Sequence, residues 1–428
     1  MPGVAIMLAT ACGTRTELLP FHDPNASCAT FDAVAQPAPL DVFLLMDSSG
    51  SMEFETEHGV VKWSAMRDAL ATFLLDQESE GIGVAMTFFP HIQPHIPDWC
   101  IDPNACGDPA ACTETRICFP SGEYCETDQD CAESGLPTDT CEPVGTCDQQ
   151  VSELCAPSVG MGCASGAPCL HLGYCENRSS CDPADYDHPP IPVGELPSAA
   201  ASLVGAMDMR TLEGSTTTLP AMQGALSAAL AWADANPSHK VIAVIATDGM
   251  PTSCDAALDD DDMNLAIEHI AAPASDALTR GVQTFVVGVF APDEQDIAEE
   301  NLGRIAQAGG TSTAFVINTG ESVGDRFLDA LNEIRWSATS CELSLPVAEL
   351  PSGGFPRGNM RATAPGKATV EAPFAGEHGC DGDGRGWFYD VDTTTGLAPS
   401  RIILCPTTCE QVDVDRDEPV EIVVDCST

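Results

Sequence analysis

Short apolar runs recur along the middle of the chain, and each has the length of a β-strand buried on both faces. They occupy residues 42–46, 83–89, 240–246, 282–290 and 313–317. The first reads Val-Phe-Leu-Leu-Met without a polar interruption. Such runs are typical of the central strands of parallel sheets, because helices cover both faces of those sheets.

Segments with apolar residues at helical spacing alternate with these runs. They cover residues 62–76, 198–209, 219–235, 262–279, 295–308 and 321–336. Pro220 suits the first turn of its helix, whereas Pro273 is expected to kink or divide the helix in which it lies. The alternation predicts an α/β fold with a doubly wound, mostly parallel sheet that is covered by helices on both faces.

The regular pattern stops between residues 97 and 197. This stretch is rich in Cys, Pro, Gly and Asp and has almost no apolar run. A segment of this composition cannot bury an ordinary core, so it requires covalent crosslinks. We therefore interpret 97–197 as a disulfide-rich insertion in a loop of a larger domain, which spans 39–338.

Cysteine is unusually frequent, with 21 residues in the chain and 13 of them from Cys100 to Cys181. Many neighbours are six residues apart, and the C-x-x-C pairs of zinc or iron–sulfur sites are missing from the sequence. This spacing favours disulfides over metal clusters, and disulfides require an oxidising compartment. We expect an exported protein, either secreted or held at the outer membrane or cell surface.

Residues 1–12 resemble a bacterial lipoprotein signal, in which a short apolar stretch from Gly3 to Ala11 ends in small residues before Cys12. In such signals the cysteine carries the lipid. The stretch is shorter than usual and no Lys or Arg precedes it, so an ordinary secretion signal is the alternative. Residues 13–38 are expected to be a tether. No later segment has the roughly 18 apolar residues of a membrane span, so a lipid on Cys12 is the only membrane attachment that we expect.

After Cys341 the pattern changes to short alternating runs with Gly, Pro and Thr, at residues 361–373, 387–391, 402–405 and 420–424. We interpret 339–428 as a small disulfide-bonded β domain.

The charge balance excludes some classes of partner. The chain has 65 acidic and 17 basic side chains. So much negative charge repels nucleic acid and anionic lipid head groups, but attracts divalent cations.

Three loops supply oxygen-bearing side chains where the predicted strands end or a helix begins. Asp47, Ser49 and Ser51 follow the first strand, Asp248 follows the strand at 240–246, and Thr216 precedes a helix. In parallel sheets, ligands bind at the carboxyl ends of the strands. Carboxylates and hydroxyls are hard ligands that suit Mg²⁺, Mn²⁺ or Ca²⁺. With only two carboxylates, the ion would remain electrophilic and attract an external carboxylate.

This pattern resembles the metal-ion-dependent adhesion site of von Willebrand factor A-type domains, over residues 40–90 and 196–338. The resemblance implies a Rossmann-like domain in which the hydroxyls of Ser49, Ser51 and Thr216 bind the ion directly. It also implies that Asp47 and Asp248 bind directly or through water, and that an acidic group of a ligand completes the octahedron. Ser215 stands where the family often has a glycine.

An enzyme is not expected. An apolar strand that ends in Asp also begins haloacid-dehalogenase-type phosphatases, but Ser49 occupies the place of their second Asp and is a poor proton shuttle. No Gly-x-Ser-x-Gly surrounds Ser49 or Ser51, as a hydrolase nucleophile would require.

Three weaker patterns have a simpler interpretation. The loop histidines are expected to be solvated, the Asp-Gly-Asp-Gly-Arg motif to be a turn, and the alternating aspartates to form one solvent face of a strand. These residues are His91, His95 and His188, then Asp381, Asp383 and Arg385, and finally Asp413, Asp415 and Asp417.

We therefore expect a cell-surface adhesion protein that engages an acidic group of a protein or glycan ligand through its cation, with the insertion beside the site. The alternative is a structural protein of the envelope or surface, in which the metal only stabilises the fold.

Overall fold

The computed structural model describes residues 31–122, 124–125, 127–133, 138–259, 262–339, 341–345, 355–376, 379–380, 384–412 and 419–425. The predicted signal with Cys12, most of the predicted tether, Asp381, Asp383 and the aspartates at 413, 415 and 417 lie outside these residues. The chain forms two compact units. Unit 2 comprises residues 38–339, and unit 1 combines residues up to 37 with those from 340 onward.

A six-stranded sheet forms the centre of unit 2. Strands β3, β2, β13, β14 and β15 run parallel, and β12 pairs antiparallel with β3 at the edge. In sheet order the strands are β12 (Ile191–Glu195), β3 (Gly83–Phe89), β2 (Leu40–Asp47), β13 (Lys240–Thr247), β14 (Gln283–Phe290) and β15 (Phe315–Asn318). Every residue of β2, β3 and β13 is buried, as the continuous apolar runs predict.

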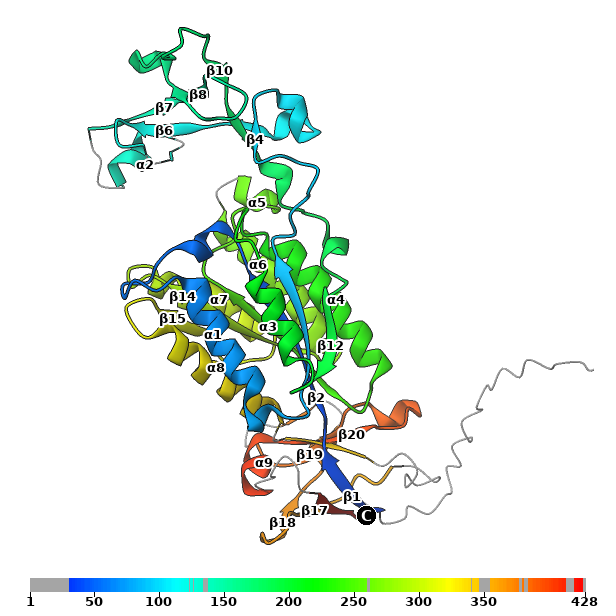
Figure 1. Ribbon diagram of the computed structural model, residues 1–428. Helices are drawn as coiled ribbons and strands as arrows, with labels where there is room; N and C mark the ends of the chain where they lie inside the picture. Colours follow the sequence, from blue (N-terminus) through cyan, green and yellow to red (C-terminus); the bar gives the residue numbers. More distant parts are fainter. Residues whose placement is uncertain are drawn as a thin grey trace, which may run out of the picture. The chain divides into compact units, whose positions relative to one another are not determined.

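Helices cover both faces of this sheet (Figure 1). Because side chains alternate along a strand, Val42 and Leu44 of β2 pack into one core, whereas Phe43 and Leu45 pack into the other. Helices α1 (Lys62–Leu75), α3 (Ala200–Asp208) and α8 (Val323–Thr339) line the first core. Helices α4 (Thr218–Ala235), α6 (Met263–Thr279) and α7 (Gln295–Ala308) line the second, and the short α5 (Ala256–Asp259) contacts α6.

Of the two outcomes predicted for Pro273, a kinked or a divided helix, division is wrong. Helix α6 continues through Pro273 to Thr279. Proline removes one backbone hydrogen bond from a helix interior. Ile270, Ala274 and Ala277 are fully buried around this position, so packing against the sheet offsets that loss.

The cysteine-rich region forms small sheets and turns held by disulfides, as predicted. Six disulfides lie within it: Cys100–Cys112, Cys106–Cys175, Cys118–Cys131, Cys125–Cys141, Cys147–Cys163 and Cys155–Cys169. Its elements are β4 (Trp99–Cys100), β5 (Cys112–Glu114), β6 (Arg116–Phe119), α2 (Asp128–Glu133), β7 (Thr140–Pro143), β8 (Gly145–Thr146), β9 (Leu154–Cys155), β10 (Leu170–His171) and β11 (Gly173–Cys175). The large sheet resumes at β12, so the final residues of the predicted insertion belong to that sheet.

Unit 1 is built on a seven-stranded antiparallel sheet with the order β18-β17-β21-β1-β16-β20-β19. The strands are β1 (Phe31–Pro37), β16 (Glu342–Ser344), β17 (Met360–Thr363), β18 (Val370–Ala372), β19 (Trp387–Tyr389), β20 (Arg401–Leu404) and β21 (Val420–Val424), and α9 (Pro406–Val412) follows β20. Trp387 is fully buried in the core of this unit, where its ring meets Tyr389 edge to face at 4.9 Å. Disulfides Cys341–Cys409 and Cys380–Cys405 lie in the same unit.

Two further predictions need correction. Residues 31–37 are not tether, because β1 pairs with both β16 and β21. The predicted fold class, a doubly wound, mostly parallel α/β sheet, is wrong for this chain, which is a mixed α and β protein. Four of the five sheets in the described residues are antiparallel, and the fifth has an antiparallel edge strand. The overlooked strands are short and lie among Pro, Gly and Cys, where the apolar pattern is weak.

None of the helices in the described part of the chain combines the length and the hydropathy needed to cross a bilayer.

Replacing Leu70 with Ala should lower the free energy of unfolding by about 3 kcal/mol, since this fully buried side chain of α1 would leave a cavity. Leu75 ends the same helix and is 66% exposed, so Leu75→Ala should change stability by less than about 0.5 kcal/mol. Urea denaturation followed by tryptophan fluorescence measures both. Equal losses in the two variants would contradict the assignment of the buried face.

Candidate functional site

Strands β2 and β13 bring two of the predicted site loops to one edge of the sheet. The strands are parallel neighbours, and Met46 lies opposite Ala246 in their register. The next residues, Asp47 and Thr247, are therefore adjacent, and Thr247 Oγ1 donates a hydrogen bond to Asp47 Oδ2 at 2.6 Å. Asp248 follows directly. The topology thus places the two aspartates at the same carboxyl edge of the sheet.

Asp47 is completely buried. Besides the bond from Thr247, its Oδ1 accepts a hydrogen bond from the backbone N–H of Ser49 at 2.9 Å. Burial and the negative charge of Asp248 raise the pKa of Asp47 to about 6, although the hydrogen bonds from Thr247 and Ser49 act in the opposite direction. The surroundings of Asp47 therefore disfavour its charge, and a nearby cation would favour it.

A chain of contacts joins Ser49, Ser51 and Asp248. The Oγ atoms of Ser49 and Ser51 are 3.1 Å apart, and Ser51 Oγ donates to Asp248 Oδ1 at 2.7 Å. Adjacent ligands of an octahedral Mg²⁺ lie about 3 Å apart, because each metal–oxygen bond is about 2.1 Å long. These oxygens are therefore spaced as neighbouring ligands of such an ion would be, and the donor set consists of hard oxygens.

Thr216 lies beside this group. Its Oγ1 is 3.8 Å from the place that a Cβ on Gly249 would occupy, which puts the hydroxyl next to the turn after Asp248. Two backbone contacts hold its loop in place: Gly50 N–H donates to Gly214 O at 3.2 Å, and Thr252 N–H donates to Thr216 O at 3.1 Å. Among the described residues, no hydrogen bond joins the Thr216 hydroxyl to the other four predicted ligands.

The site is nearly closed to solvent. Asp47, Ser49, Thr216 and Asp248 are between 0 and 4% exposed, whereas Ser51 is half-buried in the short helical turn η1 (Gly50–Glu53). Access from outside is therefore on the side of Ser51.

Sequence reasoning missed Lys62, the first residue of α1. Its Nζ is 3.0 Å from Asp248 Oδ2, and the lysine side chain is only 11% exposed. The site therefore combines two buried carboxylates with one ammonium group and keeps a net negative charge. Lys62 and Asp248 are separated by 186 positions, so no local pattern could have revealed the pair.

Arg210 was also missed. Its guanidinium donates to Ser48 Oγ at 2.9 Å and to Pro90 O at 2.6 Å, and it lies 5.2 Å from the centre of the Phe88 ring. Burial lowers the pKa of Arg210. Arg210 thus holds the side chain of Ser48, the residue between Asp47 and Ser49.

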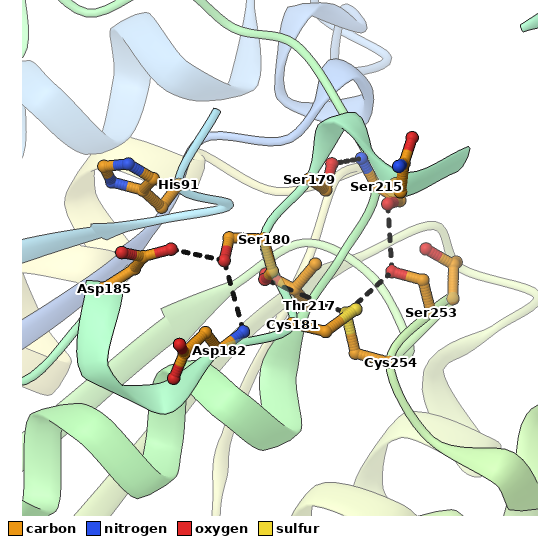
Figure 2. The surroundings of a disulfide bond; sticks show 12 residues. His91, Ser179, Ser180, Cys181, Asp182, Asp185, Ser215, Thr217, Ser253 and Cys254 are labelled. Carbon is orange, nitrogen blue, oxygen red and sulfur yellow. Dashed lines mark hydrogen bonds between the residues drawn. A yellow bond between two sulfur atoms is a disulfide. The ribbon is translucent and has the colours of Figure 1, made fainter. Parts of the chain in front are cut away.

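The end of the cysteine-rich region is joined to the site loops (Figure 2). A disulfide links Cys181 to Cys254, six residues after Asp248. Nearby, Ser215 N–H donates to Ser179 Oγ at 3.0 Å, and the Oγ atoms of Ser215 and Ser253 are 2.9 Å apart. The loop that carries Thr216 is thus attached both to the end of the insertion and to the loop after Asp248.

The histidines among the weaker candidates lie at the protein surface. His91, His95 and His188 are all exposed. Among the described residues, the clusters close enough to hold a metal consist of disulfide-bonded cysteines, one of them joined by His171.

No family model matches the chain, and no curated protein matches it in sequence. Solved structures similar to it include the PilB minor pilin from Streptococcus sanguinis, at 11% identity and a TM-score of 0.39 over 71% of this chain and 62% of that one. The pilus adhesin RrgA from Streptococcus pneumoniae is 12% identical with a TM-score of 0.34, over 92% of this chain and 58% of that one. The manganese-loaded TRAP protein from Plasmodium vivax is 11% identical with a TM-score of 0.25, over 61% of each chain.

Replacing Lys62 with Met should destabilise the metal-free protein by about 3 kcal/mol, because Asp248 would keep a buried charge without its partner. The double variant Lys62→Met with Asp248→Asn removes both charges and should recover much of that loss. Urea denaturation in EDTA gives the three values. Additive losses in the double variant would show that the pair does not interact.

Removing the Cys181–Cys254 disulfide by a double Ala substitution should cost about 3 kcal/mol of stability. Amide hydrogen exchange should increase in the loops at 213–217 and 249–254. The matched control removes Cys147–Cys163, which lies entirely within the cysteine-rich region, and should leave exchange in these two loops unchanged. If both variants show equal exchange in these two loops, the Cys181–Cys254 disulfide does not stabilise them.

Proposed function

We propose that the protein is an exported adhesion protein that binds an acidic group of a protein or glycan through a divalent cation. The cation, Mg²⁺ or alternatively Mn²⁺ or Ca²⁺, would be held by Asp47, Ser49, Ser51, Thr216 and Asp248. The site would act as a metal-ion-dependent adhesion site of the von Willebrand factor A type.

The observation that carries this proposal is the spacing of oxygens from separate loops. Ser49, Ser51 and Asp248 form a contact chain with steps of 3.1 and 2.7 Å, and the carboxylates of Asp47 and Asp248 are close enough to raise the pKa of Asp47. Two negative charges and one ammonium group leave the site short of positive charge. A divalent cation supplies that charge and polarises any carboxylate that reaches it.

The charge of the whole molecule also supports a role for a cation in ligand binding. The net charge is −48, so the surface repels an acidic ligand at long range. Contact with such a ligand then depends on a local positive centre. Nine disulfides in the described residues support an oxidising environment outside the cytosol, where a ligand on a neighbouring surface is accessible. A lipid on Cys12 would anchor the protein to its own membrane.

The hydroxyl groups suit a ligand role better than a nucleophilic one. Ser51 Oγ contacts Asp248 and Ser49, and within the described residues no histidine contacts either serine. A serine nucleophile requires an adjacent base. We therefore propose a binding protein rather than an enzyme.

Saturating Mg²⁺ should stabilise the protein, by about 2.7 kcal/mol when its concentration is about a hundredfold above Kd. Asp248→Asn should abolish this gain. Asp234→Asn is the matched control, because it removes the same charge from a side chain on α4 that is 69% exposed. Calorimetry and thermal denaturation with and without Mg²⁺ measure both effects. An unchanged Mg²⁺ response in Asp248→Asn would assign the stabilisation to diffuse surface charge.

Ligand binding should depend on the cation and on a carboxylate in the ligand. The probe is a pool of random-sequence peptides with one Glu each, compared with the same pool carrying Gln. Immobilised protein should retain the Glu pool in Mg²⁺ and release it in EDTA, whereas Asp248→Asn should retain neither pool. If EDTA lowers the melting temperature but leaves peptide retention unchanged, the metal has only a structural role and the adhesion proposal fails.

A further inference from the structure

One small sheet of the cysteine-rich region carries aromatic side chains on a single face. In the sheet β4-β11-β5, Tyr174 lies opposite Trp99 on one side and opposite Thr113 on the other. Because side chains alternate along a strand, Cys100 and Cys175 point to the opposite face, where both are buried. Disulfides thus fix one face of the sheet, while Trp99 and Tyr174 remain 38% and 40% exposed on the other.

These aromatic residues line a cavity of about 810 Å³, which is within the usual size range of small-molecule binding sites. Other lining residues come from the segment that follows β5, including Thr115 and Arg116, and from the exposed Tyr124. Backbone hydrogen bonds hold the segment that carries Thr115 and Arg116. Cys125 N–H donates to Arg116 O at 3.2 Å, and Thr115 N–H donates to Leu172 O at 3.0 Å. The cavity therefore has a rigid frame with aromatic surfaces.

The wall of the cavity also contains buried polar atoms that lack partners. Thr115 is 3% exposed, yet its Oγ1 has no hydrogen-bond partner. The Nε of Arg116 is likewise buried and unpartnered, although the same guanidinium bonds to Glu114 at 3.3 Å and to Cys141 O at 2.8 Å. Buried polar groups without partners are costly, and a water molecule or a ligand hydroxyl that bonded to them would relieve that cost.

The charges of the cavity disfavour an anionic ligand. Glu114 and Glu176 face one cation, Arg116, and Glu176 accepts a hydrogen bond from the Thr113 hydroxyl. A net negative lining repels phosphates, sulfates and acidic sugars. Carboxylates remain good acceptors for hydroxyl groups, and an alcohol can both donate to and accept from such a wall.

We propose that this cavity binds a neutral oligosaccharide. The apolar faces of its sugar rings would stack on Trp99 and Tyr174, and its hydroxyl groups would bond to Thr115 Oγ1 and Arg116 Nε. The site shares no residue with the metal-binding group. It adds to the metal-dependent function proposed above without depending on it, so binding should be the same in Mg²⁺ and in EDTA.

The test is titration of the full chain with neutral trisaccharides, followed by calorimetry and tryptophan fluorescence. The panel contains cellotriose, chitotriose, maltotriose, mannotriose and galactotriose. At least one should bind and alter the emission, and Trp99→Ala should weaken its binding by about tenfold through the loss of stacking. The matched control is Trp336→Ala, which removes another exposed tryptophan, on α8, and should leave affinity unchanged.

A second variant separates binding from folding. Thr115→Val keeps the shape of the side chain but removes the unpartnered hydroxyl, so the melting temperature should hold or rise. Saccharide affinity should nevertheless fall by about fivefold, the value of one lost hydrogen bond. A purely structural Thr115 would leave affinity unchanged.

Several outcomes would overturn the proposal. One is the absence of binding by every trisaccharide at millimolar concentration. Another is binding that Trp99→Ala and Thr115→Val leave intact. A third is selective binding of a hexaproline peptide at Trp99, which would assign the cavity to extended peptides. Loss of saccharide binding in EDTA would place the sugar at the metal group instead. Because Asp248→Asn should not affect the sugar, failure here is distinguishable from failure of the adhesion proposal.

Discussion

The repulsion between the buried carboxylates of Asp47 and Asp248 is the main electrostatic constraint on the candidate site of unit 2. Two neighbouring parallel strands end in carboxylates at the same edge of the sheet, and both carboxylates are buried. Such an arrangement is unfavourable unless hydrogen bonds and positive charge compensate it. Thr247 and the backbone of Ser49 bond to Asp47, while Lys62 pairs with Asp248. The ammonium group offsets only one of the two charges, so the remaining deficit favours a cation.

Several contacts fix the loops around the two aspartates. Gly214 adopts a φ of +84°, and a Cβ there would lie 2.6 Å from Ser179 Oγ, so only glycine fits where the insertion meets the site. The Cys181–Cys254 disulfide fixes the neighbouring loop covalently. Rigid positioning of this kind reduces the entropy lost when a ligand binds, because the loops are already ordered.

Much of unit 2 was predictable because its elements are long and strongly patterned. The run at 240–246 became β13, and the periodic segment at 295–308 is α7. Shorter strands were not predicted. Strand β12 has only five residues in a proline-rich stretch, and an exposed Val34 obscures the alternation of β1. The fold class was wrong because these antiparallel strands carry too little hydrophobic signal to stand out from loops.

The candidate site likewise combines residues that the local sequence predicts with pairings that only the fold creates. The proximity of the two loops after β2 and β13 was predictable, because neighbouring parallel strands end at the same edge of a sheet. These loops carry Asp47, Ser49, Ser51 and Asp248, each within a few residues of a strand end. Lys62 and the disulfide partner of Cys254 were not predictable, because each pairing depends on tertiary packing between distant segments. Thr216 lies beside Gly249, but the residue that bonds to its backbone, Thr252, has no signature in the sequence.

Strand β1 has a consequence for how the protein is made. Phe31 pairs with Val424, so β1, which precedes unit 2 in the sequence, joins a sheet whose remaining strands follow unit 2. Unit 2 is contiguous and can complete its own sheet while translation and export continue. The seven-stranded sheet of unit 1 cannot complete the pairing of β1 until β21 has been synthesised, and contacts of such large sequence separation form slowly. During that interval β1 has unpaired edges on both sides, which leaves it open to pairing with other chains.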